Sequence, residues 1–208
     1  MKSPLHIAVF CRPLIAGQVK TRLIPAYGVD GSADIYRQLV ERTLHTVAAT
    51  GATASLWVAG DTDHASVADW SARFALPIYA QCDGDLGERM AQSLITLAQS
   101  HDKVLLVGTD CPALSVDTLQ AGSAALSATC HWVFTPAEDG GYVLVGSNAA
   151  SGEPFADVAW STARVMTQTR HALRQSGLQW AETETLWDVD EAADVARAER
   201  LSLLAFLQ

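Results

Sequence analysis

Hydrophobic residues follow two different patterns along the chain. Short, nearly continuous apolar runs at residues 5–11, 54–59 and 103–108 have the composition of strands that are buried on both faces of a sheet. Between these runs, apolar residues recur at spacings of three and four, as over residues 31–49, and this period predicts helices with one buried face. Strands that alternate with helices predict parallel βαβ units and a sheet that is covered on both sides.

Weaker versions of the same patterns predict the other elements. Further strands are expected over residues 77–80, 132–136 and 142–145. Further helices are expected over residues 64–73, 85–99, 116–126 and 191–207, and another that ends near residue 175 is expected to be capped by Ser161 or Thr162. No linker, repeat or low-complexity tract interrupts residues 1–208. The sequence therefore predicts one α/β domain, a three-layer α/β/α sandwich with a mostly parallel sheet.

Composition and charge narrow the possible partners. The chain of 208 residues is 49% hydrophobic and 18% charged, which suits one large domain with a sizeable core and excludes disorder. Its formal net charge of -9 repels polyphosphate backbones, so we expect no nucleic-acid partner. Three cations do cluster at Arg12, Lys20 and Arg22, and such a group suits a small phosphate ligand.

Features of membrane, secreted and zinc proteins are missing from the sequence. No stretch approaches the ~20 apolar residues of a membrane helix, and Arg12 and Pro13 end the first apolar run too early for a secretory signal. The cysteines and histidines are scattered without metal-ligand spacing. We expect a cytoplasmic protein with reduced cysteines, in which Trp132 or Trp180 could form the interface of a homo-oligomer.

The loop after the first predicted strand can bind an anion. Ligands of open α/β sheets bind outside the carboxyl ends of the strands, where residues 12–23 are expected. Arg12, Lys20 and Arg22 lie in this loop, and the Arg22 guanidinium can bind two phosphate oxygens. The alternative is an ordinary exposed loop with solvated cations. The Walker pattern is absent, so this is not a P-loop. G-x-G-x-x-G is also absent after the first strand, which disfavours a dinucleotide-dependent oxidoreductase.

Carboxylates follow the best strand and precede the last helix. Asp110 comes just after the strand at residues 103–108, where an α/β enzyme holds a metal or a reacting group, and Mg²⁺ needs few carboxylates beside phosphate oxygens. Asp188 and Asp190 alternate in an extended segment, so both can face one site. Ordinary capping or turn formation remains the alternative for Asp110 and for Asp190.

Two glycine-containing segments are weaker candidates. Gly140 and Gly141 allow a ligand to approach the backbone next to Asp139 and Tyr142, although a simple hairpin turn is the favoured interpretation when the segment is taken alone. Residues 83–89, which include Gly84 and Asp85, can bind a base or ribose, or merely cap the helix that follows, with capping slightly favoured.

Together these segments resemble the bacterial DUF2064 glycosyltransferase-like family, which is similar to nucleotidyltransferases of the molybdenum-cofactor and phospholactate guanylyltransferase type. The resemblance spans nearly the whole chain and rests on Lys20-Thr21-Arg22-Leu23, Gly84-Asp85-Leu86-Gly87-Glu88-Arg89-Met90, Gly108-Thr109-Asp110-Cys111-Pro112, Asp139-Gly140-Gly141-Tyr142, Trp160-Ser161-Thr162 and Asp188-Val189-Asp190. It implies a GT-A-like fold, also called the nucleotide-diphospho-sugar transferase fold, acting on a nucleotide or nucleotide-sugar and a small-molecule acceptor.

The resemblance also implies roles for individual residues. Lys20 and Arg22 would hold phosphates, Asp110 would ligate Mg²⁺ or Mn²⁺, and Asp190 would complete the metal site. Asp139 would serve as a base or as an anchor for the acceptor. Glycosyl transfer and nucleotidyl transfer with release of pyrophosphate both stay open. Because Asp110 stands without a D-x-D pair, a non-catalytic nucleotide-sensing module is a further alternative.

Overall fold

A seven-stranded sheet forms the centre of the protein. The computed structural model describes residues 4–149 and 151–205. Within them the strands take the order β3-β2-β1-β4-β6-β5-β7. Their bounds are β1 His6–Cys11, β2 Thr53–Val58, β3 Ile78–Ala80, β4 Val104–Val107, β5 Trp132–Pro136, β6 Tyr142–Ser147 and β7 Trp180–Glu182. Only β6 runs antiparallel to its neighbours β4 and β5, and every other pair is parallel.

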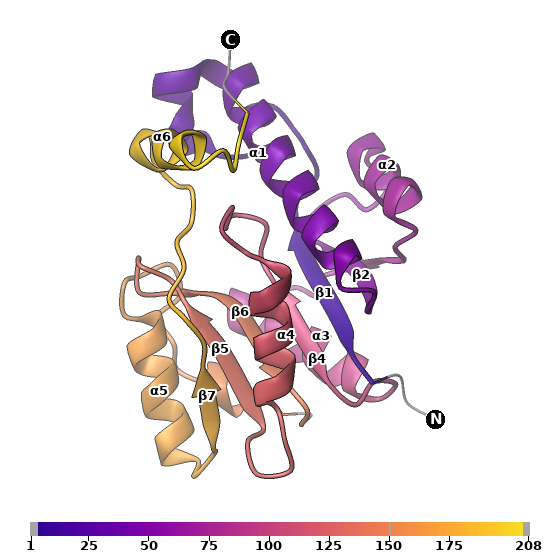
Figure 1. Ribbon diagram of the computed structural model, residues 1–208, viewed down its shortest axis with the longest axis vertical. Coiled ribbons are helices and arrows are strands. Elements are labelled where there is room, and N and C mark those ends of the chain that lie inside the picture. Colours follow the sequence, from indigo (N-terminus) through magenta and orange to yellow (C-terminus); the bar gives the residue numbers. More distant parts are fainter. Residues whose placement is uncertain (1–3, 150, 206–208) are drawn as a thin grey trace.

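Helices cover both faces of this sheet (Figure 1). On one face lie α1, α2 and α4, and on the other lie α3 and α5, so the predicted α/β/α sandwich is confirmed. The helices span α1 Ile24–Ala49, α2 Ala65–Phe74, α3 Leu86–Ala98, α4 Val116–Ala125, α5 Val165–Gln175 and α6 Ala192–Arg200, with short 3₁₀ turns at η1 Thr21–Leu23 and η2 Glu153–Phe155.

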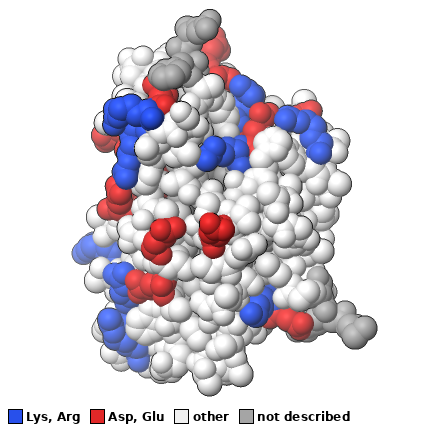
Figure 2. All heavy atoms as spheres, in the orientation of Figure 1, with Lys and Arg blue, Asp and Glu red and all other residues white. Residues whose placement is uncertain are grey.

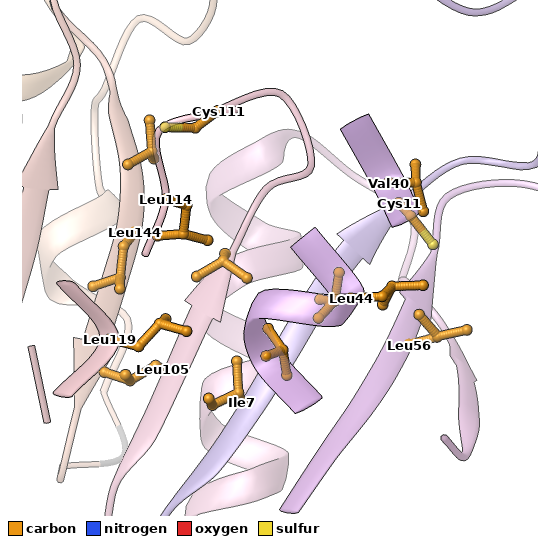
Figure 3. Packing of buried hydrophobic residues seen from close by; sticks show 14 of the residues in the cluster. Ile7, Cys11, Val40, Leu44, Leu56, Leu105, Cys111, Leu114, Leu119 and Leu144 are labelled. Carbon is orange, nitrogen blue, oxygen red and sulfur yellow. The ribbon is translucent and has the colours of Figure 1, made fainter. Parts of the chain in front are cut away.

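Alternate residues of the central strands supply the two layers of the core. In β1, Ile7 and Val9 face α1, while Ala8 and Phe10 face α3 on the other side of the sheet. Figure 3 shows the first of these layers, where α1 and α4 pack over β1, β2, β4 and β6. The central strands are therefore buried on both faces, which explains why they read as continuous apolar runs.

A third apolar cluster attaches the C-terminal segment to the rest of the molecule. Trp187 and Val189 are buried against the first half of α1, together with residues of α6. A kink at Gly28, with φ of 70°, redirects α1 just before this contact. The cluster holds residues 186–190 across the carboxyl ends of the strands, where the candidate site lies.

Several sequence predictions require correction. The strand β7 was not predicted, and α6 ends at Arg200, while residues 206 and 207 of the predicted helix lie outside the described residues. Helix α5 begins at Val165 with Arg164 as its N-cap, so neither Ser161 nor Thr162 caps it. Trp132 is fully buried between the sheet and η2, where it cannot form an interface between subunits.

Candidate active site

The carboxyl ends of β1 and β4 border a cavity of about 620 Å³. In the sheet, β2 lies on one side of β1 and β4 lies on the other, so the order of the strands reverses between β1 and β4. The carboxyl ends of these two strands are therefore a topological switch point, where α/β proteins bind ligands. The reversal of β6 brings its first residue, Tyr142, to the same edge. Among the predicted site residues, those that line the cavity are Arg12, Arg22, Asp110, Asp139, Gly141, Tyr142 and Asp190.

Lys20 joins the first loop to two carboxylates of the site. Its Nζ lies 2.8 Å from Oδ1 of Asp110 and 3.4 Å from Oδ1 of Asp190, and it donates a hydrogen bond of 2.6 Å to the carbonyl of Val189. The Lys20 side chain is only 7% exposed, whereas those of Asp110 and Asp190 are 46% and 45% exposed. Lys20, which was predicted to bind a phosphate, is thus buried and paired with these two carboxylates in this structure.

Local backbone geometry places Lys20 in this position. Residue 20 adopts the left-handed conformation, with φ and ψ both 44°, directly before the 3₁₀ turn Thr21–Leu23. Burial lowers the pKa of Lys20, but the charge and hydrogen bond of Asp110 and the charges of Asp190 and Asp188 outweigh it, so its pKa is raised. Lys20 is therefore held as a buried ammonium.

Arg22 lies on the outer side of the same carboxylate. Its Nη1 is 3.1 Å from Oδ2 of Asp190, and its side chain is 72% exposed. Arg12 is also exposed at the cavity, where its backbone N–H donates to the Tyr36 hydroxyl over 2.8 Å. Two exposed arginines therefore line the cavity, and both guanidinium groups have donors for an anionic ligand.

Asp188 is the most strongly perturbed carboxyl group of the site. Burial, together with the charges of Asp110, Asp139 and Asp190, raises its pKa to about 7 against the opposing effect of Lys20. Asp188 and Asp190 both line the cavity, as their alternation in an extended segment predicts. Several carboxylates therefore converge at a place where the positive charge of the Lys20 ammonium only partly balances their negative charge.

Capping does not explain Asp110 or Asp190. The N-cap of α4 is Ser115, and the N-cap of α6 is Glu191, which forms a capping box with Asp194. The segment that carries Asp190 is instead tied to the end of β4, because the Val189 N–H donates to the Asp110 carbonyl over 2.9 Å. Both carboxylates are thus positioned toward the cavity by the backbone.

The Asp139 segment forms the turn between β5 and β6, so the simple interpretation of its sequence is confirmed. The Gly141 N–H donates to the Asp139 carboxylate over 2.8 Å within this turn. Gly140 does not line the cavity; its φ is 91°, and a Cβ there would lie 2.2 Å from the Ala163 carbonyl oxygen. The turn is therefore both a hairpin and one wall of the cavity.

Gly84 and Asp85 are not among the residues that line the cavity. Asp85 is the N-cap of α3 and forms a capping box with Glu88, so capping, the slightly favoured interpretation, is confirmed. The first turn of α3 instead presents Leu86 and Arg89 to the cavity. A binding role for Gly84 and Asp85 stays a prediction.

Trp160 forms part of the cavity wall beside α3. A Cβ on Gly87 would lie 2.6 Å from the Trp160 ring, so the absence of a side chain at residue 87 allows the indole to lie directly against α3. The ring also meets Tyr142 edge to face at 6.4 Å between centroids. The cavity is thus lined by aromatic as well as charged side chains.

On the face of the molecule shown in Figure 2, acidic and basic side chains are interspersed, and the basic residues do not merge into one broad patch.

None of the helices in residues 4–149 and 151–205 is long and apolar enough to cross a membrane. The four cysteines are all free, and burial raises the pKa of both Cys11 and Cys111 to about 12.

These features define an α/β protein with the GT-A-like fold of nucleotide-diphospho-sugar transferases. The chain belongs to the DUF2064 family, described as uncharacterized proteins conserved in bacteria, whose model matches residues 43–162. No curated protein matches the chain in sequence.

Solved structures are similar over nearly the whole chain. A Desulfovibrio desulfuricans G20 protein with the provisional name nucleotide-diphospho-sugar transferase is 28% identical, with a TM-score of 0.87 over 96% of this chain and 88% of that chain. The 4-diphosphocytidyl-2C-methyl-D-erythritol synthase of Anaerococcus prevotii is 10% identical, with a TM-score of 0.63 over 97% of both chains. Glucosyl-3-phosphoglycerate synthase of Mycobacterium tuberculosis, solved with Mn²⁺ and UDP, is 10% identical, with a TM-score of 0.51 over 99% of this chain and 81% of that chain.

Proposed function

We propose that this protein is a transferase that uses a nucleotide or nucleotide-diphospho-sugar donor together with Mg²⁺ or Mn²⁺. The observation that carries the proposal is the convergence of Asp110 and Asp190 on a single cationic nitrogen at the switch point of the sheet. Similarity to sugar and nucleotidyl transferases of the same fold supports it.

The carboxylates fit a divalent cation. Oδ1 of Asp110 and Oδ1 of Asp190 both contact the Lys20 ammonium, so one positive charge already lies within reach of both. Within residues 4–149 and 151–205, no group of three or more His, Cys, Asp or Glu side chains is arranged to hold a metal. Mg²⁺ nevertheless needs only one or two carboxylates when waters and phosphate oxygens complete its shell. Asp110 and Asp190 would therefore hold the cation, with the donor phosphates as its remaining ligands.

The other residues divide between donor and acceptor. Arg12 and Arg22 would bind the donor phosphates, and Lys20 would neutralise charge on the departing group. A bound divalent cation supplies charge neutralisation at the phosphates. Asp139 would orient or deprotonate the acceptor beside Gly141 and Tyr142. The chain thus contributes mainly positioning and electrostatic stabilisation.

Two reactions are compatible with these residues. Attack of an acceptor hydroxyl on the sugar carbon would be glycosyl transfer, whereas attack on the α-phosphorus would be nucleotidyl transfer with release of pyrophosphate. Relatives in fold include proteins named for each chemistry. We expect a single domain and a cytoplasmic location. A nucleotide-sensing module without turnover is the alternative from another class.

A thermal-shift experiment tests the proposal. Nucleotides and nucleotide-sugars are added with and without Mn²⁺ to the wild type, to Asp110→Asn, and to Asp117→Asn, which changes an exposed carboxylate on α4. A ligand at a hundred times its Kd adds about 2.7 kcal/mol, which raises Tm by about 5–10 °C in a chain of this length.

The expected result is a metal-dependent shift that is lost in Asp110→Asn and kept in Asp117→Asn. Product analysis with the best ligand then distinguishes sugar transfer from pyrophosphate release, and binding without turnover on any acceptor would favour the sensing module. A shift in Tm that depends on neither the metal nor Asp110 would show that the metal assignment is wrong.

A further inference from the structure

We propose that the Lys20 ammonium occupies the cation position between Asp110 and Asp190 in the metal-free protein and competes directly with the divalent cation for that position. The inference rests on the proposed function, since it assumes that these two carboxylates are the metal ligands. It assigns to Lys20 a role as an internal placeholder that must move before the donor complex is complete.

The contacts of Lys20 leave no room for a phosphate in the present arrangement. An ammonium has three N–H donors. Three oxygens surround Nζ: the Val189 carbonyl at 2.6 Å, Asp110 Oδ1 at 2.8 Å and Asp190 Oδ1 at 3.4 Å. Every donor therefore has a partner within the protein, and Lys20 can bind a phosphate only after it leaves the carboxylates.

Burial distinguishes Lys20 from the neighbouring cations. Its side chain is 7% exposed, while Arg22, two residues later, contacts the same carboxylate from outside with 72% exposure. Lys20 also holds a left-handed backbone conformation, which is unfavourable for a residue other than glycine. The fold thus directs an ammonium between the two carboxylates at a local conformational cost, which a solvated phosphate ligand would not require.

Charge explains why this position needs a cation at all. Asp188 interacts electrostatically with Asp110, Asp139 and Asp190, so four carboxyl groups share this part of the site. Without a cation at their centre, the carboxylates would repel one another. One ammonium holds them in place, but it offers a single charge, and an ion with two charges binds the same oxygens more strongly. Because both cations contact the same oxygens, they cannot be bound there together.

The exchange couples metal binding to donor binding. Without a nucleotide, a displaced Lys20 loses three partners and gains only water, so metal binding is weak. Donor phosphates offer the ammonium a new anionic partner beside Arg22, so the metal and the nucleotide bind with positive cooperativity. Removal of the ammonium therefore strengthens metal binding in the absence of nucleotide and reduces the cooperativity.

Calorimetric titration with Mn²⁺ alone tests the competition. The proteins are the wild type, Lys20→Met, Asp110→Asn and the matched control Lys103→Met, in which the lost ammonium donates to the Ser123 carbonyl. We expect Lys20→Met to bind Mn²⁺ about tenfold or more tightly than the wild type, and Lys103→Met to bind like the wild type. Equal or weaker binding by Lys20→Met would overturn the inference.

A labelling experiment on the wild type avoids dependence on a folded variant. Amines are acetylated briefly with and without Mn²⁺, and the modification of each lysine is quantified by mass spectrometry. Mn²⁺ should expose Lys20 to the reagent and leave Lys103 unchanged. Protection of Lys20 that persists in Mn²⁺-bound protein would refute the displacement.

The two experiments also separate this inference from the proposed function. Mn²⁺ binding that depends on Asp110, with Lys20 still protected, would overturn the inference and leave the metal assignment standing. Mn²⁺ binding that is unchanged in Asp110→Asn would remove the metal assignment and the inference together.

Discussion

We predict that His6 makes the protein sensitive to acid, independently of the active site. His6 begins β1 at the end of the sheet opposite the cavity, and it is 5% exposed. Its ring nitrogens contact Thr53 Oγ1 at 3.0 Å and Ser55 Oγ at 2.8 Å, and the ring lies 4.3 Å from that of His101. Burial and, to a lesser extent, the charge of the nearby His101 lower the pKa of His6 to about 4.

The direction of the effect follows from the two states of the imidazole. The unfolded chain binds the proton near pH 6.5, whereas the folded protein binds it near pH 4. Between these values the unfolded state carries more protons, so the contribution to stability is complete above pH 6.5 and is lost as the pH falls toward 4. At 1.36 kcal/mol per pKa unit, the full loss is about 3 kcal/mol.

Urea unfolding at pH 7.5 and pH 4.5 measures this loss. The proteins are the wild type, His6→Gln, whose amide can still pair with Thr53 and Ser55, and His171→Gln, which changes an exposed histidine on α5. Carboxylates titrate similarly in all three, so the comparison isolates His6. We expect the wild type and His171→Gln to lose about 2–3 kcal/mol more than His6→Gln. An equal loss in all three proteins would refute the reasoning.

Two glycine substitutions, each compared with a control substitution, test the packing next to the cavity. Gly140→Ala places a Cβ 2.2 Å from a backbone oxygen at positive φ and should cost about 2 kcal/mol or more, whereas Gly177→Ala, also at positive φ but in open space, should cost about 1 kcal/mol. Gly87→Ala should cost about 1–3 kcal/mol by displacing Trp160. Gly122→Ala on α4 meets only ordinary contacts and should gain up to about 1 kcal/mol. Chemical denaturation measures all four, and equal effects within either pair would contradict the packing argument.

The fold was predictable wherever burial was strong. The strands β1, β2 and β4 are covered on both faces, so their apolar runs are nearly continuous, and α3 has both a regular stripe and an Asp85 cap. The three-residue edge strand β7 has no such signal, because its residues are only partly buried and pair with one neighbour. Helix α6 was predicted too long because apolar residues continue past its end at Arg200.

The candidate site was predictable in position but not in its contacts. Asp110 and Asp139 were located correctly at one sheet edge because the carboxyl ends of strands can be read from the order of elements, whereas Asp190 was assigned through the family resemblance. The burial of Lys20 was not predictable, because its partners Val189 and Asp190 lie 169 and 170 residues away. The exact cap of α6, Glu191 rather than Asp190, likewise depends on geometry that spacing alone does not determine.

The reversed direction of β6 has a consequence for how this architecture diversifies. A crossover helix between β5 and β6 would pack against the sheet, so any change in its length would disturb the core. The chain instead joins these strands by a short turn at the rim of the cavity. Such a turn tolerates insertions, because the paired strands beneath it keep their register. Insertions before Gly140 can thus reshape the proposed acceptor side without disturbing the sheet, while the close contact of Gly140 with the Ala163 backbone fixes the base of the turn.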